Sequence, residues 1–231
     1  MAANWPEPTG YRDSSVVVLH AGSSDGSCSV LPGCATRKYH SSRRDAFKSI
    51  NQEPIAHVKI GSDGPSIEMG DAVGFDARPE AISPMMFEES TRIAQFVADA
   101  HLHPDLVQAA IDAGYDALLF HGTGLGHLPI ADPQEDSPEN TRLRIMLADH
   151  CAAGGVVVVV TQTIHGPVHM DVYDKGRDQQ EMGIIGHGSL CPPSSALVKL
   201  HHLLSRDEGR DAVAEGWDSD LVGENPPDAL S

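Results

Sequence analysis

The sequence is poor in positive charge and has no long hydrophobic run. Of its 231 residues, 16 are lysine or arginine and 33 are aspartate or glutamate, a formal net charge of −17. A surface with this balance repels nucleic acid and anionic lipid, so we expect no direct DNA binding. The longest apolar run, 156–160, is far shorter than the roughly 20 residues of a spanning helix. We therefore expect no membrane segment.

The opening residues also lack the basic stretch and apolar core of an export signal, so we expect a cytoplasmic protein. The acidic excess is typical of proteins from a high-salt cytoplasm. At 1 M salt the Debye length is only about 3 Å, which screens self-repulsion that would be costly in dilute buffer. The composition therefore predicts a salt-loving source.

Several site signatures are missing. The four cysteines are too widely spaced for a paired C-x-x-C zinc site, and we expect free thiols. No G-x-S-x-G nucleophile motif occurs. Among the 13 histidines, His165 and His169 have helical i, i+4 spacing, but Gly166 and Pro167 between them break a helix. We therefore predict no metal site.

The chain divides into two parts near residue 85. Residues 14–20 and 28–31 are expected strands, and 54–60 and 66–69 form an expected hairpin around the Asp-Gly-Pro turn. Prolines at 79 and 84 then interrupt any periodicity, which predicts a domain boundary near 85.

Beyond that boundary, strands and helices alternate. The expected strands are 92–97, 117–120 and 156–160, and the expected helices are 104–113, 140–153 and 194–204. A fully apolar strand such as 156–160 is normally buried in a parallel sheet. The pattern predicts an α/β fold with a small doubly wound parallel sheet, whose ligands meet the loops beyond the strands' carboxyl ends. We expect residues 207–231 to form an acidic tail, with a short helix at 208–215.

Basic residues are concentrated in one segment. Residues 36–51 contain Arg37, Lys38, Arg43, Arg44 and Lys48. A lysine crowded by cations is a candidate proton shuttle, and the cluster could also hold a phosphate or a carboxylate. The alternative is a solvated basic turn balanced by nearby acids.

A second candidate is the glycine-rich loop HGTGLGH, residues 121–127, which follows an expected strand. Its three glycines permit positive φ and close backbone approach, as a ligand loop needs. A dinucleotide site would require a helix to open at the third glycine, but an acidic, proline-containing stretch follows instead. A small-ligand regulatory loop remains an alternative.

Taken together, the motifs resemble the L-asparaginase superfamily, and most closely the D subunits of archaeal glutamyl-tRNA(Gln) amidotransferases. The segments VVVLHAGSSDGSCSV and RKYHSSRRDAFKSIN look like the end of that family's first domain. GYDALLFHGTGLGHLP, AAGGVVVVVTQTIHGPVHMDVY and ALVKLHHLLS look like its C-terminal domain. HSSRRDAFKSIN favours the tRNA-dependent protein over a free L-asparaginase, which remains an alternative.

The resemblance assigns parts of the chain and candidate site residues. It implies that residues 1–85 are the C-terminal part of the family's N-terminal domain and that 86–206 are its C-terminal domain. Lys38 falls on the catalytic lysine, which assists proton transfer around a threonine nucleophile. Thr123, Gly124, Leu125, Gly126 and His127 fall on a loop that helps complete a neighbouring subunit's site.

The resemblance also implies partners and an activity. The expected partners are the tRNA-binding E subunit, which brings tRNA indirectly, and a second D subunit. No cofactor is expected in this chain, with ATP only at the partner E subunit. The implied activity is release of ammonia from glutamine or asparagine for amidation of Glu-tRNA(Gln).

The sequence departs from the family at the nucleophile. The family's threonines lie in T-G-G-T-I-A and G-T-D-T stretches, and neither stretch occurs here. By resemblance, the sequence begins about midway through the first domain, which makes that domain partial. Lys38 without the threonine cannot form an acyl-enzyme. A non-catalytic, truncated asparaginase-like module is therefore the alternative function.

Overall fold

The computed structural model describes residues 15–70, 85–206 and 208–225. The chain divides into two compact units, and the division falls after Met85. Pro79 and Pro84, on which the expected boundary rests, lie outside the described residues. Each unit has a hydrophobic core of its own. In the part of the chain that is described, no helix is long and apolar enough to cross a membrane.

The first unit is built mainly from an antiparallel sheet with the strand order β1-β2-β5-β6. These strands are β1 (Val16–His20), β2 (Ser27–Pro32), β5 (Ala56–Gly61) and β6 (Gly64–Met69). Gly61 lies opposite Gly64, so a two-residue turn joins β5 to β6, and Gly64 has a φ of +105°. The expected hairpin is confirmed. Val30, Ile55 and Val58 are core residues of this unit.

A short ribbon in the same unit carries the basic segment. A 3-10 turn, η2 (Gly33–Ala35), leads into β3 (Thr36–Lys38), which pairs antiparallel with β4 (Phe47–Ser49). Because side chains alternate across a strand, Arg37 and Lys38 lie on opposite faces of this ribbon.

The second unit contains the predicted parallel sheet. Strands β7 (Ile93–Val97), β8 (Ala117–Gly122) and β9 (Val156–Thr161) lie in the order β7-β8-β9. Helix α1 (Pro104–Asp112) connects β7 to β8, and α2 (Pro138–Ala152) connects β8 to β9. All six residues of β9 are buried, as expected for an apolar strand of a parallel sheet that is covered on both faces. The α/β fold is confirmed.

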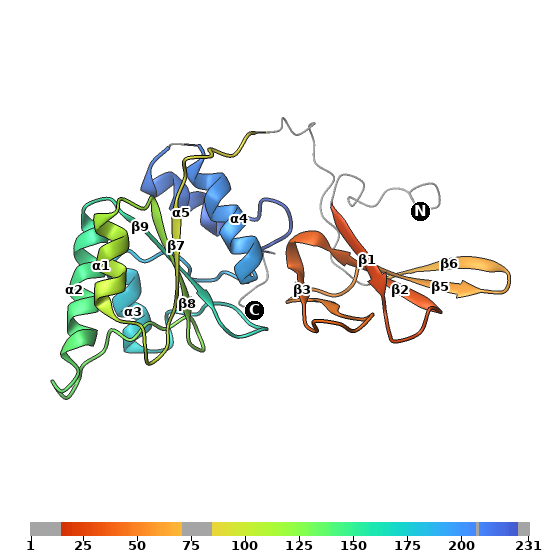
Figure 1. Cartoon of the computed structure of the whole chain (residues 1–231), viewed down its shortest axis with the longest axis horizontal. Coiled ribbons are helices and arrows are strands. Elements are labelled where there is room, and N and C mark those ends of the chain that lie inside the picture. The colour runs from red at the N-terminus through yellow and green to blue at the C-terminus, as the bar shows by residue number, and fades with distance from the viewer. Residues whose placement is uncertain (1–14, 71–84, 207, 226–231) are drawn as a thin grey trace. The chain divides into compact units, whose positions relative to one another are not determined.

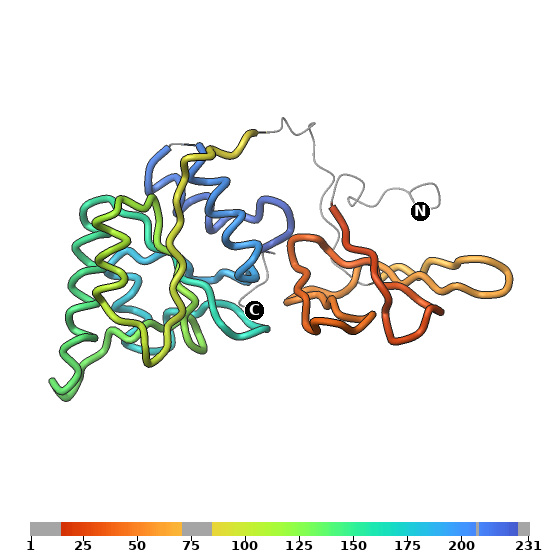
Figure 2. The backbone as a smooth tube through the Cα atoms, in the orientation of Figure 1, coloured from red at the N-terminus to blue at the C-terminus, as the bar shows by residue number. Residues whose placement is uncertain are grey.

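Helices cover both faces of this sheet (Figure 1). Phe120 of β8 packs in one core with residues of α1 and α2, while its neighbour Leu119 packs in another with residues of α4 (Pro193–Leu204) and α5 (Arg210–Asp218). The alternation of side chains along each strand thus supplies apolar groups to two layers. Figure 2 shows the backbone winding through these layers.

Helix α3 (Asp174–Glu181) was not expected from the sequence. Its residues, DKGRDQQE, have no apolar periodicity. The helix packs instead through Gly176, where a Cβ would lie 2.3 Å from the carbonyl oxygen of Met170, and through the fully buried Gln179. Packing through a glycine and an amide leaves no hydrophobic signal to predict.

Within the expected acidic tail a short helix does form, as α5, and residues 208–225 pack into the second unit. Trp217 of α5 is buried against α4. The ammonium group of Lys199 on α4 donates to the carbonyl oxygen of Trp217 (2.8 Å) and pairs with Glu224 (2.8 Å). The free energy gained by burying the side chains of Trp217 and Val213 exceeds the cost of holding the exposed acidic residues around them in place.

Glu224 is expected to make stability depend on acid. Burial alone would raise its pKa, but the hydrogen bond and charge of Lys199 hold the pKa below its ordinary value of 4.5. A carboxyl group whose pKa is lower in the folded state stabilises above its unfolded pKa and loses that contribution as pH falls through the folded one. The stability advantage of the natural chain over Glu224→Gln should therefore shrink below about pH 4.5.

Urea unfolding at a series of pH values measures this difference. Both chains should carry Asp220→Asn, because burial raises the pKa of the neighbouring Asp220 and gives it the opposite pH dependence. A difference that stays constant from neutral to acidic pH would contradict the assignment of the charge to Glu224.

Candidate functional site

The glycine loop at the carboxyl end of β8 is a tight, closed turn. The N–H of Thr123 donates to the carbonyl oxygen of His127 (2.9 Å), and the N–H of His127 donates back to Thr123 (2.9 Å). Gly124 and Gly126 have φ values of +52° and +93°, which L side chains rarely adopt. Two of the three glycines therefore serve the turn itself.

Neighbouring elements hold this loop in place. The buried amide of Gln179 on α3 donates to the carbonyl oxygen of Gly126 (3.0 Å) and accepts from the N–H of Leu128 (2.8 Å). The N–H of His169 donates to the carbonyl oxygen of Leu125 (3.0 Å). The loop thus presents Thr123 and Gly124 as an exposed tip on a fixed base.

This geometry does not support a phosphate cradle. The N–H groups of Thr123, Gly126 and His127 all donate within the loop, and a phosphate cradle needs such groups directed at the ligand. The sequence predicts that no helix begins at the third glycine. The structure has a turn at 123–127 and no helix directly after it.

His127 forms the inner end of the loop. It lies edge-on to Tyr173, with 5.5 Å between ring centres. Burial, together with the charge of Lys175, lowers the pKa of His127. The ring is therefore neutral at neutral pH, and its Nε2 is buried without a hydrogen-bond partner in the described structure.

Two residues at the end of β9 also join this edge of the sheet. The hydroxyl of Thr161 donates to the carbonyl oxygen of Gly124. The side-chain amide of Gln162 donates to the carbonyl oxygens of Ala98 (2.8 Å) and His121 (2.7 Å). Sequence reasoning missed Thr161, Gln162 and Gln179. Thr161 and Gln162 could have been found, because they are polar residues that directly follow the apolar run 156–160.

Lys38, the predicted proton-transfer residue, is exposed on β3 in the first unit. Its ammonium nitrogen lies 5.6 Å from the centre of the Phe47 ring on β4. Thr36, on the same strand, donates its hydroxyl to the carbonyl oxygen of Pro32 (2.5 Å). The hydroxyl of Thr36 is thus directed to the backbone and not to Lys38. In the described part of this unit, no threonine is activated by Lys38.

The arginines of the basic segment have different surroundings. Arg43 forms two hydrogen bonds with the carboxylate of Asp45 (2.9 and 2.8 Å), and Arg44 pairs with Asp25. Burial alone would raise the pKa of Asp45, but Arg43 and Lys48 hold it below its ordinary value. Arg37 is exposed and lies directly opposite Lys48 in the ribbon. Two of the three predicted arginines are therefore already paired.

None of the four cysteines, all of which lie in the described residues, forms a disulfide bond, as expected. Cys151 is buried, and burial raises the pKa of its thiol. A high pKa and burial both disfavour the reactive thiolate, so Cys151 is no candidate nucleophile.

Residues 92–215, more than half of the chain, match the family described as Glutaminase/Asparaginase C-terminal domain. This chain belongs to the glutaminase/asparaginase family. The matched segment contains the whole parallel sheet, the glycine loop and helices α1 to α4.

Curated relatives of this glutaminase/asparaginase chain are named as D subunits of glutamyl-tRNA(Gln) amidotransferase. The D subunit from Methanosarcina mazei is 35% identical over 214 residues, which are 91% of this chain and 44% of the relative. The one from Methanopyrus kandleri is 33% identical over 90% of this chain and 43% of the relative. The chain thus spans less than half the length of these two relatives.

Solved asparaginases share the fold. L-asparaginase I from Vibrio cholerae aligns with a TM-score of 0.69 and 25% identity, over 86% of this chain and 55% of that one. The thermostable L-asparaginase from Thermococcus kodakarensis aligns with a TM-score of 0.63 and 22% identity, over the same shares. The asparaginase-like architecture expected from the sequence motifs is confirmed.

Proposed function

We propose that this chain forms the C-terminal half of an amide-cleaving D subunit, which releases ammonia from glutamine or asparagine for amidation of Glu-tRNA(Gln). The observation that carries the proposal is the 35% identity to an amidotransferase D subunit over 91% of this chain. The basic segment HSSRRDAFKSIN, by which the sequence resembles these amidotransferase proteins rather than a free L-asparaginase, supports it.

The proposed chemistry needs a hydroxyl from outside these 231 residues. A threonine oxygen attacks the carbon of the side-chain amide, the C–N bond breaks, and ammonia leaves. Water then hydrolyses the acyl-threonine to the free acid. Lys38 carries the proton between the hydroxyl and the leaving nitrogen. A lysine accepts a proton only as the neutral amine, and burial favours that form. Lys38 is exposed in this structure. The proposal therefore includes that the part of the D subunit carrying the threonine also covers Lys38.

The glycine loop takes a second role in this proposal. Its tip, Thr123 and Gly124, is exposed on a base fixed by Gln179 and His169. A fixed, projecting tip suits insertion into the site of a second D subunit. The tRNA and ATP would be bound by an E subunit.

Fragment complementation tests the proposal. The chain is mixed with the N-terminal half of an amidotransferase D subunit that carries both threonine stretches, and ammonia release from glutamine and asparagine is measured at molar salt. We expect no release from this chain alone and release from the mixture. Lys38→Ala should lower that rate about 100-fold or more, because positioned proton transfer contributes at least that much.

Lys59→Ala is the matched control, since Lys59 is an exposed strand lysine of the same unit, paired with Glu68. It should leave the rate nearly unchanged. Release that Lys38→Ala does not reduce would contradict the role of Lys38.

A non-catalytic module is the second candidate function, favoured by the absence of both threonine stretches and by the exposure of Lys38. Halves that co-purify as a folded complex without releasing ammonia would support it and contradict amide cleavage.

A further inference from the structure

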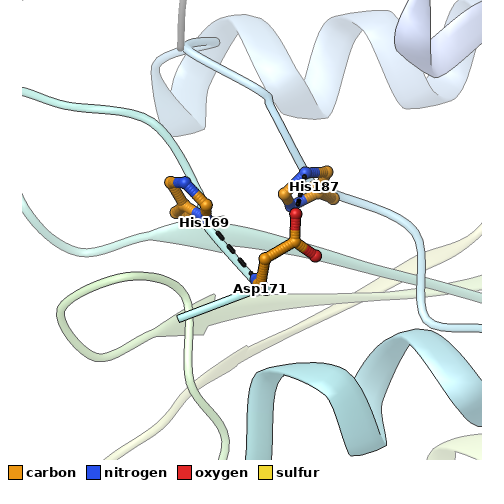
Figure 3. A group of neighbouring side chains, drawn as sticks. All are labelled: His169, Asp171 and His187. Atoms are coloured by element: carbon orange, nitrogen blue, oxygen red, sulfur yellow. Dashed lines mark hydrogen bonds and ion pairs between the residues drawn. The ribbon is translucent and has the colours of Figure 1, made fainter. Parts of the chain in front are cut away.

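Three ligand-bearing side chains meet beside the glycine loop. His169 and Asp171 lie in the segment that follows β9, and His187 follows Ile185, which is bridged to Val158 of β9. Each offers one ligand atom, and these atoms lie within 4.8 Å of one another. Figure 3 shows the carboxylate of Asp171 directed toward His187, with the His169 ring beside it.

We propose that His169, Asp171 and His187 bind one divalent transition-metal ion, with Zn²⁺ as the best-suited ion. Two imidazole nitrogens and a carboxylate oxygen are a ligand set that Zn²⁺ takes readily in proteins. Three protein ligands leave a further position open to water. The proposal replaces the prediction of no metal site and is independent of the proposed amide cleavage.

The carboxylate and one ring are held in position by neighbours. The side-chain amide of Gln180 donates to Oδ1 of Asp171 (2.8 Å), while Oδ2 lies 3.4 Å from Nε2 of His187. The N–H of Met170 donates to Nδ1 of His187 (3.0 Å). Contacts of this kind, one shell beyond the ligands, orient metal sites.

The same contacts limit the affinity. Because Nδ1 of His187 accepts a hydrogen bond, the neutral ring carries its proton on Nε2. A metal ion at Nε2 must move that proton to Nδ1, and the bond from Met170 is then lost. Asp171 is also exposed. We therefore expect micromolar binding, weaker than in a buried structural zinc site.

A bound ion would clamp two segments that support the glycine loop. The N–H of Val168 donates to the carbonyl oxygen of Ser189 (2.9 Å), and the N–H of Gly188 donates to Val168 (2.9 Å). His169 itself donates its N–H to Leu125 in the loop. The metal would thus reinforce an existing backbone link at the base of the loop.

Isothermal titration of the chelator-treated whole chain with Zn²⁺ at neutral pH and molar salt tests the site. We expect one ion per chain. Asp171→Asn and His187→Asn should each weaken binding at least 10-fold, about the effect of losing even an outer-shell partner. His187→Asn keeps a side-chain acceptor for the N–H of Met170 in place of Nδ1, and it removes the ligand atom Nε2. His101→Asn, at an exposed histidine outside the cluster, should bind as the natural chain does.

The proposal is overturned if no Zn²⁺ binds, if the two cluster variants bind as tightly as the natural chain, or if His101→Asn weakens binding as much as they do. Thermal melting without metal checks that each variant folds. Should either cluster variant fail to fold, His169→Ala takes its place, because among residues 15–70, 85–206 and 208–225 the His169 ring accepts a single long bond, from the N–H of Asp171 at 3.4 Å.

Discussion

Replacement of Lys199 by methionine is expected to destabilise the second unit by about 3–5 kcal/mol, the cost of removing one partner from a buried ion pair. The side chains of Lys199 and Glu224 are 4% and 2% exposed, and their charged atoms lie 2.8 Å apart. Lys199 also donates to the carbonyl oxygens of Trp217 and Ser219. Methionine would leave the Glu224 carboxylate buried without its cation. Urea unfolding followed by far-ultraviolet circular dichroism measures the loss.

An exposed pair in the same unit supplies the control. The guanidinium of Arg142 lies 2.6 Å from the carboxylate of Asp105, but both side chains are about half exposed or more. Arg142→Met should therefore cost less than about 1 kcal/mol. The double variant Lys199→Met, Glu224→Leu should recover part of the stability that Lys199→Met loses, because the carboxylate is no longer buried without its cation, while the N–H groups of Leu221 and Val222 lose it as an acceptor. Equal losses for Lys199→Met and Arg142→Met would contradict a buried pair.

Gly122→Ala is expected to destabilise the second unit by about 3 kcal/mol, at the upper end of the usual cost of overpacking. A Cβ at Gly122 would lie 2.5 Å from the backbone carbonyl carbon of Gly126. Backbone cannot rotate away as a side chain can, so the turn closed between Thr123 and His127 would have to open. The same unfolding measurement detects the loss, and weaker complementation with the N-terminal half would accompany it.

Gly124→Ala tests whether crowding or conformation matters more in this loop. A Cβ at Gly124 meets nothing within 4 Å, but the residue has a φ of +52°. An alanine there incurs only the left-handed backbone cost of roughly 1–2 kcal/mol. If Gly124→Ala destabilised as much as Gly122→Ala, the close approach of Gly122 to Gly126 would not be the controlling feature.

Much of the second unit could be predicted because its strands and helices carry local signals. The run of valines that forms β9 is apolar on both faces, and the strand is buried on both. Glycines 154 and 155 end α2, and Gly154 has a φ of +91°. A left-handed residue after a helix is a signal that the sequence shows directly.

The fixed base of the glycine loop could not be predicted from the sequence. Gln179 holds the loop with two hydrogen bonds from a helix that has no apolar stripe. His169 and His187 meet only because the segments after β9 and after Ile185 run side by side. Spacing along the chain says nothing about contacts between residues so far apart in sequence.

The sequence by itself determined the class of fold, the two units and the family motifs, because hydrophobic periodicity, turn residues and short motifs are local properties. Only the tertiary structure decided which polar groups are buried and paired. The packing of Trp217 draws the acidic residues 208–225 into the second unit, where Lys199 and Glu224 neutralise each other. A charge count treats every acidic residue as exposed, whereas the free energy of a charge depends on the solvent and the partners that the fold leaves to it.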